Sequence, residues 1–238
     1  TFILPENKLD EIAITLGLEE YYKLEKIVSQ CEKSGVHTKF IPDYGNIIPT
    51  RPYTEDLLGL PVINIRYVPL SNTFNAMVKR LMDIVGSIIC IVIFSPVMLL
   101  SAILVKITSS GPLIFKQERV GLHNEKFMMY KFRTMYVQTE EEEKKGWTQK
   151  NDPRVTKVGG FLRKTSLDEF PQLFNVLKGD MSLVGPRPER PQYVEKFREE
   201  IPRYMIKHQV RPGMTGWAQV NGYRGDTSIR KRIEHDLY

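Results

Sequence analysis

One long apolar block constrains this chain more than any other feature. The block runs from Leu81 to Ile107 and is interrupted by Asp83, by Lys106 and by the pair Ser95-Pro96. A helix of roughly 20 apolar residues can cross a bilayer, so the length of the block suits a membrane segment. The alternative is the central helix of a soluble core, although such helices seldom run so long. The block therefore predicts attachment to a membrane.

The proline and the flanking charges of the block predict its path. A proline inside a helix removes a backbone donor and clashes with the preceding turn, so the helix should kink or break at Ser95-Pro96. A simple span usually has Lys and Arg concentrated on one side. Here basic residues flank both ends: Lys79, Arg80, Lys106, Lys116 and Arg119. We therefore favour a re-entrant hairpin over about 77–108, with a kinked span as the alternative.

Charge and cysteine content narrow the class of partner and the compartment. The net charge of +6 favours anionic partners, which include nucleic acid, acidic lipid and phosphorylated small molecules. A nucleic-acid binder is disfavoured because the chain has no recognition motif and carries a membrane segment. Cys31 and Cys90 have no neighbouring Cys or His at metal-ligand spacing. They form no disulfide framework either, so a reducing, cytoplasmic setting is expected.

The N-terminal residues predict a parallel α/β layer. Strand-like runs cover residues 9–16, 36–41 and 60–65, and a helical pattern covers 19–33. This order resembles the C-terminal part of a doubly wound, Rossmann-like domain over residues 1–70. Nucleotide binding by this part is unsupported, because no glycine-rich phosphate loop is present. The chain starts at Thr1 and stops at Tyr238 without a clear terminal signal, so we expect a fragment.

The residues after the apolar block predict a small α+β domain. Strands are expected at 113–117 and 126–135, separated by a turn at 121–124. Helices are expected at 166–177 and 192–198, and the charge run at 139–145 reads as a solvated helix or loop. The predicted fold class is thus α/β: a partial Rossmann-like parallel α/β domain, a re-entrant membrane helix, and a small α+β catalytic domain within residues 71–238.

The segment TSLDEFP at 165–171 is the central candidate for chemistry. On local pattern, Ser166 with Glu169 three residues later is a capping box, which is a structural feature. However, a carboxylate in the first turn of a helix, such as Asp168, is kept ionised by the helix dipole. The same helix end offers free N–H groups to a phosphate. Such a carboxylate could attack phosphorus or hold Mg²⁺.

Basic residues near this segment could hold phosphate groups. Arg163 and Lys164 precede it, and Arg187 lies between two prolines that fix its backbone. Lys131 and Arg133 alternate with apolar residues, which on a strand puts both on one face. The structural alternative for the Pro-Arg-Pro segment around Arg187 is a rigid surface turn. The alternative for Lys131 and Arg133 is an ordinary amphipathic strand.

Several long motifs in order carry a family resemblance. They are FKQERVG at 115–121, KFRTM at 131–135, SLDEFPQLFNVLKGDMSLVGPRP at 166–188 and VRPGMTGWAQVNG at 210–222. Together they resemble the bacterial polyprenyl-phosphate sugar-1-phosphate transferases, the monotopic phosphoglycosyl transferases, over about residues 74–238. The N-terminal part resembles the soluble domain of the larger members. These enzymes begin exopolysaccharide, capsule and O-antigen synthesis.

The resemblance implies a role for each matching residue. Asp168 matches the nucleophile that attacks the sugar-bearing phosphorus of a UDP-sugar, and Glu169 matches its acidic partner. The two are expected to hold Mg²⁺. Ser95-Pro96 matches the helix-breaking pair of the re-entrant hairpin. Phosphate or substrate contacts are implied for Lys131, Arg133, Arg163, Arg187 and Gln219.

The resemblance also implies substrates, location and alternatives. The tail at 220–227 looks most like members that transfer glucose 1-phosphate from UDP-glucose to undecaprenyl phosphate. Galactose or an N-acetylated sugar is the alternative donor. The implied location is the bacterial cytoplasmic membrane, with the catalytic domain facing the cytoplasm, and a homo-oligomer is compatible with it. A non-catalytic, membrane-anchored nucleotide-sugar binding module is the competing function, and it predicts loss of a carboxylate or of its basic neighbours.

Overall fold

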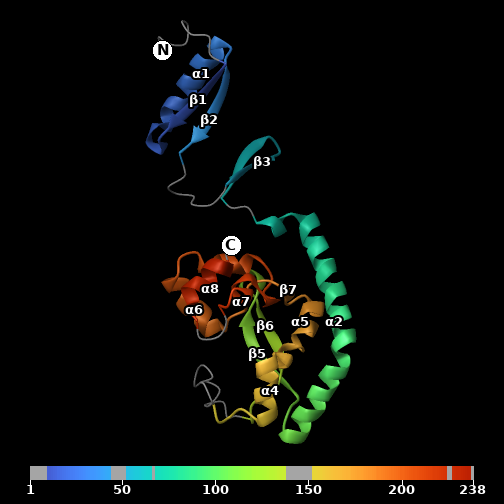
Figure 1. The fold of residues 1–238 in the computed structure, drawn as a ribbon. Helices are drawn as coiled ribbons and strands as arrows, with labels where there is room; N and C mark the ends of the chain where they lie inside the picture. The colour runs from blue at the N-terminus through green and yellow to red at the C-terminus, as the bar shows by residue number, and fades with distance from the viewer. Residues whose placement is uncertain (1–9, 44–51, 66–67, 138–151, 224–226, 237–238) are drawn as a thin grey trace. The chain divides into compact units, whose positions relative to one another are not determined.

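The computed structural model describes residues 10–43, 52–65, 68–137, 152–223 and 227–236. The chain divides into two compact units, Thr1–Ser71 and Asn72–Tyr238 (Figure 1). Each unit is described by itself, and the predicted charge run at 139–145 lies outside the described residues.

The first unit contains the predicted strand, helix and strand. β1 (Glu11–Leu16) is followed by a 3-10 helix, η1 (Leu18–Lys23), by α1 (Leu24–Ser34) and by β2 (His37–Pro42). β1 and β2 pair in parallel, with Ile14 opposite Phe40. Gly35 ends α1 in the left-handed conformation (φ 68°), which glycine adopts without steric cost. The prediction of a parallel β-α-β arrangement is confirmed here.

The predicted third parallel strand is wrong. β4 (Leu60–Asn64) pairs antiparallel with β3 (Tyr53–Leu57), a strand that the sequence analysis did not predict. Only Leu58 and Gly59 separate the two strands, and both have positive φ, as the tight turn of a hairpin requires. A parallel pair would need a much longer crossover. Among the described residues each sheet has two strands, so no Rossmann sheet is present.

The apolar block forms a single helix, α2 (Thr73–Thr108). Asn72 caps its start by accepting hydrogen bonds from the backbone N–H groups of Phe74 and Asn75, at 2.9 and 3.3 Å. Over its most apolar 18-residue window the mean hydropathy is 2.9 and only 11% of residues are buried within the chain. By length and composition, it is the one helix among the described residues that could cross a membrane.

The helix continues through Ser95-Pro96 and is curved rather than broken into two helices (Figure 1), and a re-entrant path through a membrane stays a prediction. A proline removes one backbone hydrogen bond, and a long helix can absorb that loss by bending. The Ser95 hydroxyl donates to the Val92 carbonyl at 2.8 Å. Both halves of α2 contact the rest of the second unit: Arg80 donates to the Val176 carbonyl, and Val105 packs with Phe132 and Leu162.

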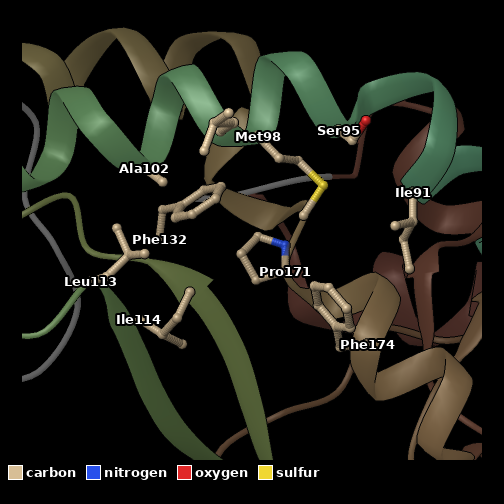
Figure 2. Close-up of a pocket in the computed structure, with 10 residues that line it drawn as sticks. Ile91, Ser95, Met98, Ala102, Leu113, Ile114, Phe132, Pro171 and Phe174 are labelled. Carbon is tan, nitrogen blue, oxygen red and sulfur yellow. The ribbon is translucent and has the colours of Figure 1, made fainter.

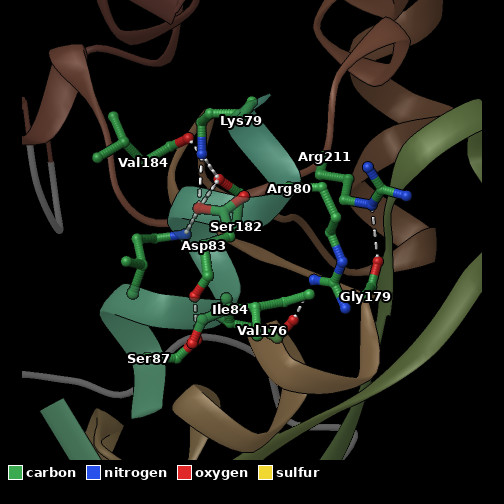
Figure 3. Close-up of polar contacts among 11 residues, drawn as sticks. Lys79, Arg80, Asp83, Ile84, Ser87, Val176, Gly179, Ser182, Val184 and Arg211 are labelled. Atoms are coloured by element: carbon green, nitrogen blue, oxygen red, sulfur yellow. Dashed lines mark hydrogen bonds and ion pairs between the residues drawn. The ribbon is translucent and has the colours of Figure 1, made fainter. Parts of the chain in front are cut away.

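A polar cluster fastens the first half of α2 (Figure 3). Asp83 is buried, and its Oδ1 accepts from Lys79 Nζ at 2.6 Å, Ser182 Oγ at 3.0 Å and Leu183 N at 3.1 Å. The neighbouring Arg80 donates to the carbonyls of Val176 and Leu177 at 2.6 and 2.7 Å. A buried carboxylate is tolerated only when it is paired and hydrogen-bonded, as Asp83 is.

The second unit is built on a hairpin and several short helices (Figure 1). β5 (Ile114–Val120) and β6 (Lys126–Phe132) pair antiparallel around the turn η3 (Leu122–Asn124), as predicted. The remaining elements are α4 (Lys157–Thr165), η4 (Leu167–Glu169), α5 (Gln172–Lys178), β7 (Ser182–Val184), α6 (Pro191–Glu200), η5 (Tyr204–Gln209), β8 (Gly213–Thr215), α7 (Trp217–Val220) and α8 (Ile229–Asp236). β7 and β8 pair in parallel, and α6 confirms the helix predicted at 192–198.

The helix predicted over 166–177 is divided, and the capping box is not formed. Ser166 has left-handed backbone angles (φ 60°, ψ 15°) and ends α4, a helix that the sequence analysis missed. Its side chain makes no capping hydrogen bond to the 3-10 turn η4 that follows. α5 begins only at Gln172, after Pro171. The segment 166–171 is therefore a sharp turn between two helices.

We expect the Asp83 cluster to contribute strongly to stability. Asp83→Leu keeps the size of the side chain but leaves the Lys79 charge and the Leu183 N–H without this acceptor. The free energy of unfolding should fall by about 2 kcal/mol. Thermal unfolding in nanodiscs measures the loss. The double change Lys79→Met with Asp83→Leu should recover part of the lost stability, because the unpaired lysine charge is then removed as well. Glu20→Gln is the control: Glu20 forms an exposed pair with Lys23, so its loss should leave stability nearly unchanged. Equal effects of Asp83→Leu and Glu20→Gln would contradict the assignment.

Candidate active site

The candidate site lies where β6, η4 and the segment after β7 meet. Glu169 is the common partner: its Oε1 accepts from Lys131 Nζ at 2.8 Å and lies 3.5 Å from Arg187 Nη2. Lys131 comes from β6, Glu169 from η4 and Arg187 from the loop that follows β7. The fold therefore brings together three residues that are up to 56 positions apart in the sequence (187 minus 131).

Asp168 precedes Glu169 and is only 8% exposed. Burial raises the pKa of its carboxyl group, and the nearby charges of Lys131 and Arg163 work against that rise. The expectation that a helix dipole keeps Asp168 ionised is not met, because η4 is a three-residue turn rather than the first turn of a long helix. The cations, not a dipole, favour the charged form.

Arg163 lies at the end of α4, close enough to Asp168 for its charge to act there. Its Nε donates to Thr134 Oγ1 at 2.7 Å, which fixes the stem of the side chain. Burial lowers the pKa of the guanidinium, and the charge of Asp168 opposes that shift. α4, which carries Arg163, packs closely against Thr134, because a Cβ on Gly159 of the same helix would lie 2.0 Å from the Thr134 carbonyl oxygen.

Arg133 does not join this group, contrary to the expectation that it shares a face with Lys131. β6 ends at Phe132, so the strand alternation no longer applies to Arg133. Its Nη2 donates to the Ser109 carbonyl at 2.6 Å and to the Ser109 hydroxyl at 2.9 Å. Gly111 has a φ of 120° and leaves room for this guanidinium, because a Cβ there would lie 2.1 Å from Nη1. Arg133 thus ties β6 to the end of α2.

Gln219 lies on the short helix α7, and its substrate role stays a prediction. Its side-chain oxygen is buried, and among the residues that the structure describes it meets no hydrogen-bond donor. An unsatisfied buried acceptor is unusual and calls for a partner such as water or a ligand.

Asp168 and Glu169 are the carboxylates that a Mg²⁺ ion would meet in this site. Within the described ranges, no group of three His, Cys, Asp or Glu side chains is arranged to hold a metal ion. Asp168 and Glu169 supply two adjacent carboxylates, and Mg²⁺ commonly uses one or two carboxylates together with substrate phosphates and water. One oxygen of Glu169 is bound by Lys131 and Arg187. The pair fits a magnesium ion that arrives with a diphosphate.

An apolar pocket of about 320 Å³ lies within the second unit, between α2 and the elements that pack on it (Figure 2). Ser95 is the only polar residue of its lining. Pro171, two positions after Glu169, brings the pocket close to the carboxylates, and the neighbouring rings of Phe94 and Phe170 are 4.9 Å apart. The lining consists of Ile91, Ser95, Met98, Leu99, Ala102, Leu113, Ile114, Phe132, Pro171 and Phe174.

Sequence reasoning missed this pocket because its lining comes from four separate segments. It also missed the buried charges around the loop of Arg187. Arg119 was noted only as a flank of the apolar block, and Lys207 and Glu189 were not singled out. No local pattern distinguishes these three residues from ordinary surface charges, although all three are largely buried.

Comparisons with known proteins identify similar chains. The family model described as "Bacterial sugar transferase" matches residues 74–238. A Klebsiella pneumoniae protein named UDP-glucose:undecaprenyl-phosphate glucose-1-phosphate transferase is 44% identical over 98% of this chain and 50% of its own length. An Escherichia coli protein of the same name is 42% identical over 97% of this chain and 50% of its own length.

A third relative carries the name of another sugar. It is the UDP-N-acetylgalactosamine-undecaprenyl-phosphate N-acetylgalactosaminephosphotransferase of Aeromonas hydrophila, 52% identical over 71% of this chain and 40% of its own length. The chain thus spans about half the length, or less, of these curated relatives.

The electrostatics of Asp168 can be tested without any substrate. In metal-free protein, the pKa of the Asp168 carboxyl should lie above its ordinary range, because burial disfavours the ionised form. Lys131→Met removes a cation that lowers this pKa, so the pKa should rise further and Asp168 should stay protonated to higher pH. Carboxyl ¹³C NMR titration measures both. Lys178→Met, which removes an exposed lysine, should cause no shift; an equal shift in both variants would contradict this account.

Proposed function

This chain belongs to the bacterial sugar transferase family, and we propose that it transfers glucose 1-phosphate from UDP-glucose to undecaprenyl phosphate and releases UMP. The observation that carries the proposal is the buried Asp168 next to Glu169, on which Lys131 and Arg187 converge. Two acids surrounded by cations suit a diphosphate substrate. This reaction would be the first membrane step in making a bacterial polysaccharide.

The proposed chemistry has two displacements at one phosphorus atom. In the first, an oxygen of the Asp168 carboxylate attacks the sugar-bearing phosphorus of UDP-glucose, and the bond to the bridging oxygen breaks, so that UMP leaves. In the second, a phosphate oxygen of the lipid attacks the aspartyl phosphosugar and releases Asp168. Partial burial favours attack because a poorly solvated carboxylate is a better nucleophile.

The basic residues would stabilise the charge on phosphorus during each displacement. Lys131 and Arg187 point at Glu169 from two elements, so both can reach phosphoryl oxygens bound beside it. Arg163 lies on the side of Asp168 and would contact the same diphosphate. Asp168 and Glu169 would hold Mg²⁺, which when bound neutralises charge on the diphosphate.

The donor sugar is proposed with less direct support than the chemistry. Two relatives that match nearly the whole chain carry glucose in their names, and the tail at 220–227 also resembles glucose-transferring members. The Aeromonas relative, named for N-acetylgalactosamine, is more similar over a shorter stretch. An N-acetylated sugar or galactose is therefore the alternative donor for the same chemistry.

The non-catalytic binding module is less well supported. That reading predicts loss of one carboxylate or of its basic neighbours, and here both carboxylates and three basic residues are present: Lys131, Arg163 and Arg187. Lys131 and Arg187 contact Glu169, and the charge of Arg163 acts on Asp168.

The acceptor lipid fits the apolar features of the second unit. α2 has the length and hydropathy of a membrane helix, and the apolar pocket on it begins two residues from Glu169. We propose that the first isoprene units of undecaprenyl phosphate lie in this pocket, which leaves the phosphate beside Asp168. The protein would then act at the bacterial cytoplasmic membrane with its site facing the cytoplasm. A homo-oligomer stays a prediction.

Loss of the nucleophile tests the enzyme directly. Protein in nanodiscs with Mg²⁺ and undecaprenyl phosphate should release UMP from UDP-glucose, and Asp168→Asn should lower the rate by at least about 10³-fold, because the amide cannot form the covalent intermediate. Coupled UMP detection and intact-protein mass spectrometry measure the rate and the adduct. Asp180→Asn, on the same unit, is the control and should retain activity. UMP release from an N-acetylated donor alone would replace glucose, and none from any UDP-sugar with folded protein would favour the binding module.

Filling the apolar pocket tests the site of the lipid. Ala102→Phe places a ring in the pocket and should raise the KM for undecaprenyl phosphate about tenfold, equivalent to about 1.4 kcal/mol of lost apolar contact. Val92→Phe is the control, because Val92 is exposed on the same helix outside the pocket. The stoichiometric UMP burst without lipid should be the same in both variants. An unchanged KM in Ala102→Phe would place the lipid elsewhere.

A further inference from the structure

The segment Gly185-Pro186-Arg187-Pro188-Glu189, here called the strap, is held along its whole length by outside partners. Its four consecutive carbonyl oxygens, from Pro186 to Glu189, each accept one hydrogen bond from a residue beyond the strap. The donors in order are Gly213 N at 2.9 Å, Lys207 Nζ at 3.4 Å, Arg119 Nη1 at 3.1 Å and Val120 N at 3.0 Å. The Gly185 N–H also donates to the Thr215 carbonyl at 2.9 Å.

This complete set of contacts has a local cause. The two prolines have no backbone N–H, so the strap cannot form the hydrogen bonds of a regular β-strand. Its carbonyl oxygens still accept hydrogen bonds, and buried carbonyl groups need donors. The strap also packs without spare room: a Cβ on Gly185 would lie 2.4 Å from the Arg211 carbonyl oxygen.

Two of the four donors are buried cations. Lys207 is 4% exposed, and the side chain of Arg119 is 12% exposed. Burial lowers the pKa of Lys207 and lowers the pKa of Arg119 to about 10, and in both cases the charge of Glu189 is the largest opposing influence. A cation in such a place is retained only beside a compensating anion.

Glu189 is that anion, and it belongs to the strap itself. Its carboxylate is buried, with Oε2 3.8 Å from Arg119 Nη1 and Oε1 3.3 Å from Arg232 Nη1. The other carboxyl group near Lys207 is Asp236, and burial raises its pKa, which weakens it as a counter-charge. Glu189 is therefore the main opposing charge for the two cations that bind the strap, Arg119 and Lys207.

We propose that Glu189 is a positioning residue for Arg187. Its carboxylate lies 3.8 Å from Arg119 Nη1 and keeps that cation in place beside Lys207. Arg119 and Lys207 fix the carbonyls of Pro188 and Arg187, and the fixed backbone directs the Arg187 guanidinium toward Glu169, 3.5 Å away. Glu189 itself contacts no part of the catalytic pair. The inference rests on the proposed function, in which Arg187 binds the diphosphate of the UDP-sugar.

A double-mutant cycle separates positioning from general stability. Glu189→Gln should slow the UMP burst at least tenfold when Arg187 is present. In an Arg187→Ala background the same change should cost less than twofold, because no guanidinium is left to direct. Glu189→Asp, which keeps the charge, should recover part of the rate. Glu118→Gln, in an exposed pair on β5, is the matched control and should behave like the parent. Equal losses in both backgrounds would overturn the proposal.

A second readout needs no activity. In Glu189→Gln, amide hydrogen exchange at Val120 and Gly213 should become at least tenfold faster under conditions where the variant remains folded, because both amides donate to the strap. Unchanged exchange would also overturn the proposal. If the parent protein released no UMP from any donor, the proposed function would fail. The amide exchange rates at Val120 and Gly213 would still test whether Glu189 holds the strap in place. If Glu189→Gln does not fold, Lys207→Met takes its place in both experiments, with the same expected results.

Discussion

Buried charge must be paired, and that requirement organises the second unit. Asp83 pairs with Lys79 where α2 meets β7, and Glu189 pairs with Arg119 and Arg232 behind the strap. Glu169 pairs with Lys131 and Arg187 in the candidate site. In each place a single carboxylate joins segments that are distant in sequence. Because a buried ion without its partner is far more costly than a lost surface contact, these junctions specify which segments meet.

The junctions also connect the apolar helix to the catalytic pair. α5 lies between them: Arg80 of α2 binds the carbonyls at its C-terminal end, where a cation is favoured, and the turn with Asp168 lies at its other end. Phe94 of α2 contacts Phe170, next to Glu169. α2 therefore touches both ends of the segment that carries the carboxylates, so its position relative to the bilayer would set the height of the site.

Sequence patterns predicted the features that depend on local periodicity or on whole motifs. The β1-α1-β2 unit, the β5–β6 hairpin, α6 and the long apolar helix were predictable in this way, and so was the grouping of Lys131, Glu169 and Arg187. Three errors have different causes. The two-residue turn at Leu58-Gly59 makes β4 the antiparallel partner of β3, and the left-handed backbone angles of Ser166 end α4 there. Arg133 lies beyond the end of β6 and binds Ser109, a tertiary contact that local propensity does not encode. At Pro96, the continuity of a long helix outweighed the loss of one hydrogen bond.

Under the proposed function, the groups that bind phosphate and the groups that select the sugar would be different, which is compatible with relatives that are named for different sugars. All the charged groups that converge on Asp168 and Glu169 are suited to phosphate oxygens, which every UDP-sugar presents alike. Such groups can supply binding and charge stabilisation, but they cannot distinguish glucose from an N-acetylated sugar. Discrimination requires buried polar groups that pair with one sugar and are left unpaired by another. The buried oxygen of Gln219 on α7, which meets no donor among the residues that the structure describes, is a group of that kind, so under the proposed function we infer that sugar choice depends on the region of α7 rather than on the carboxylates.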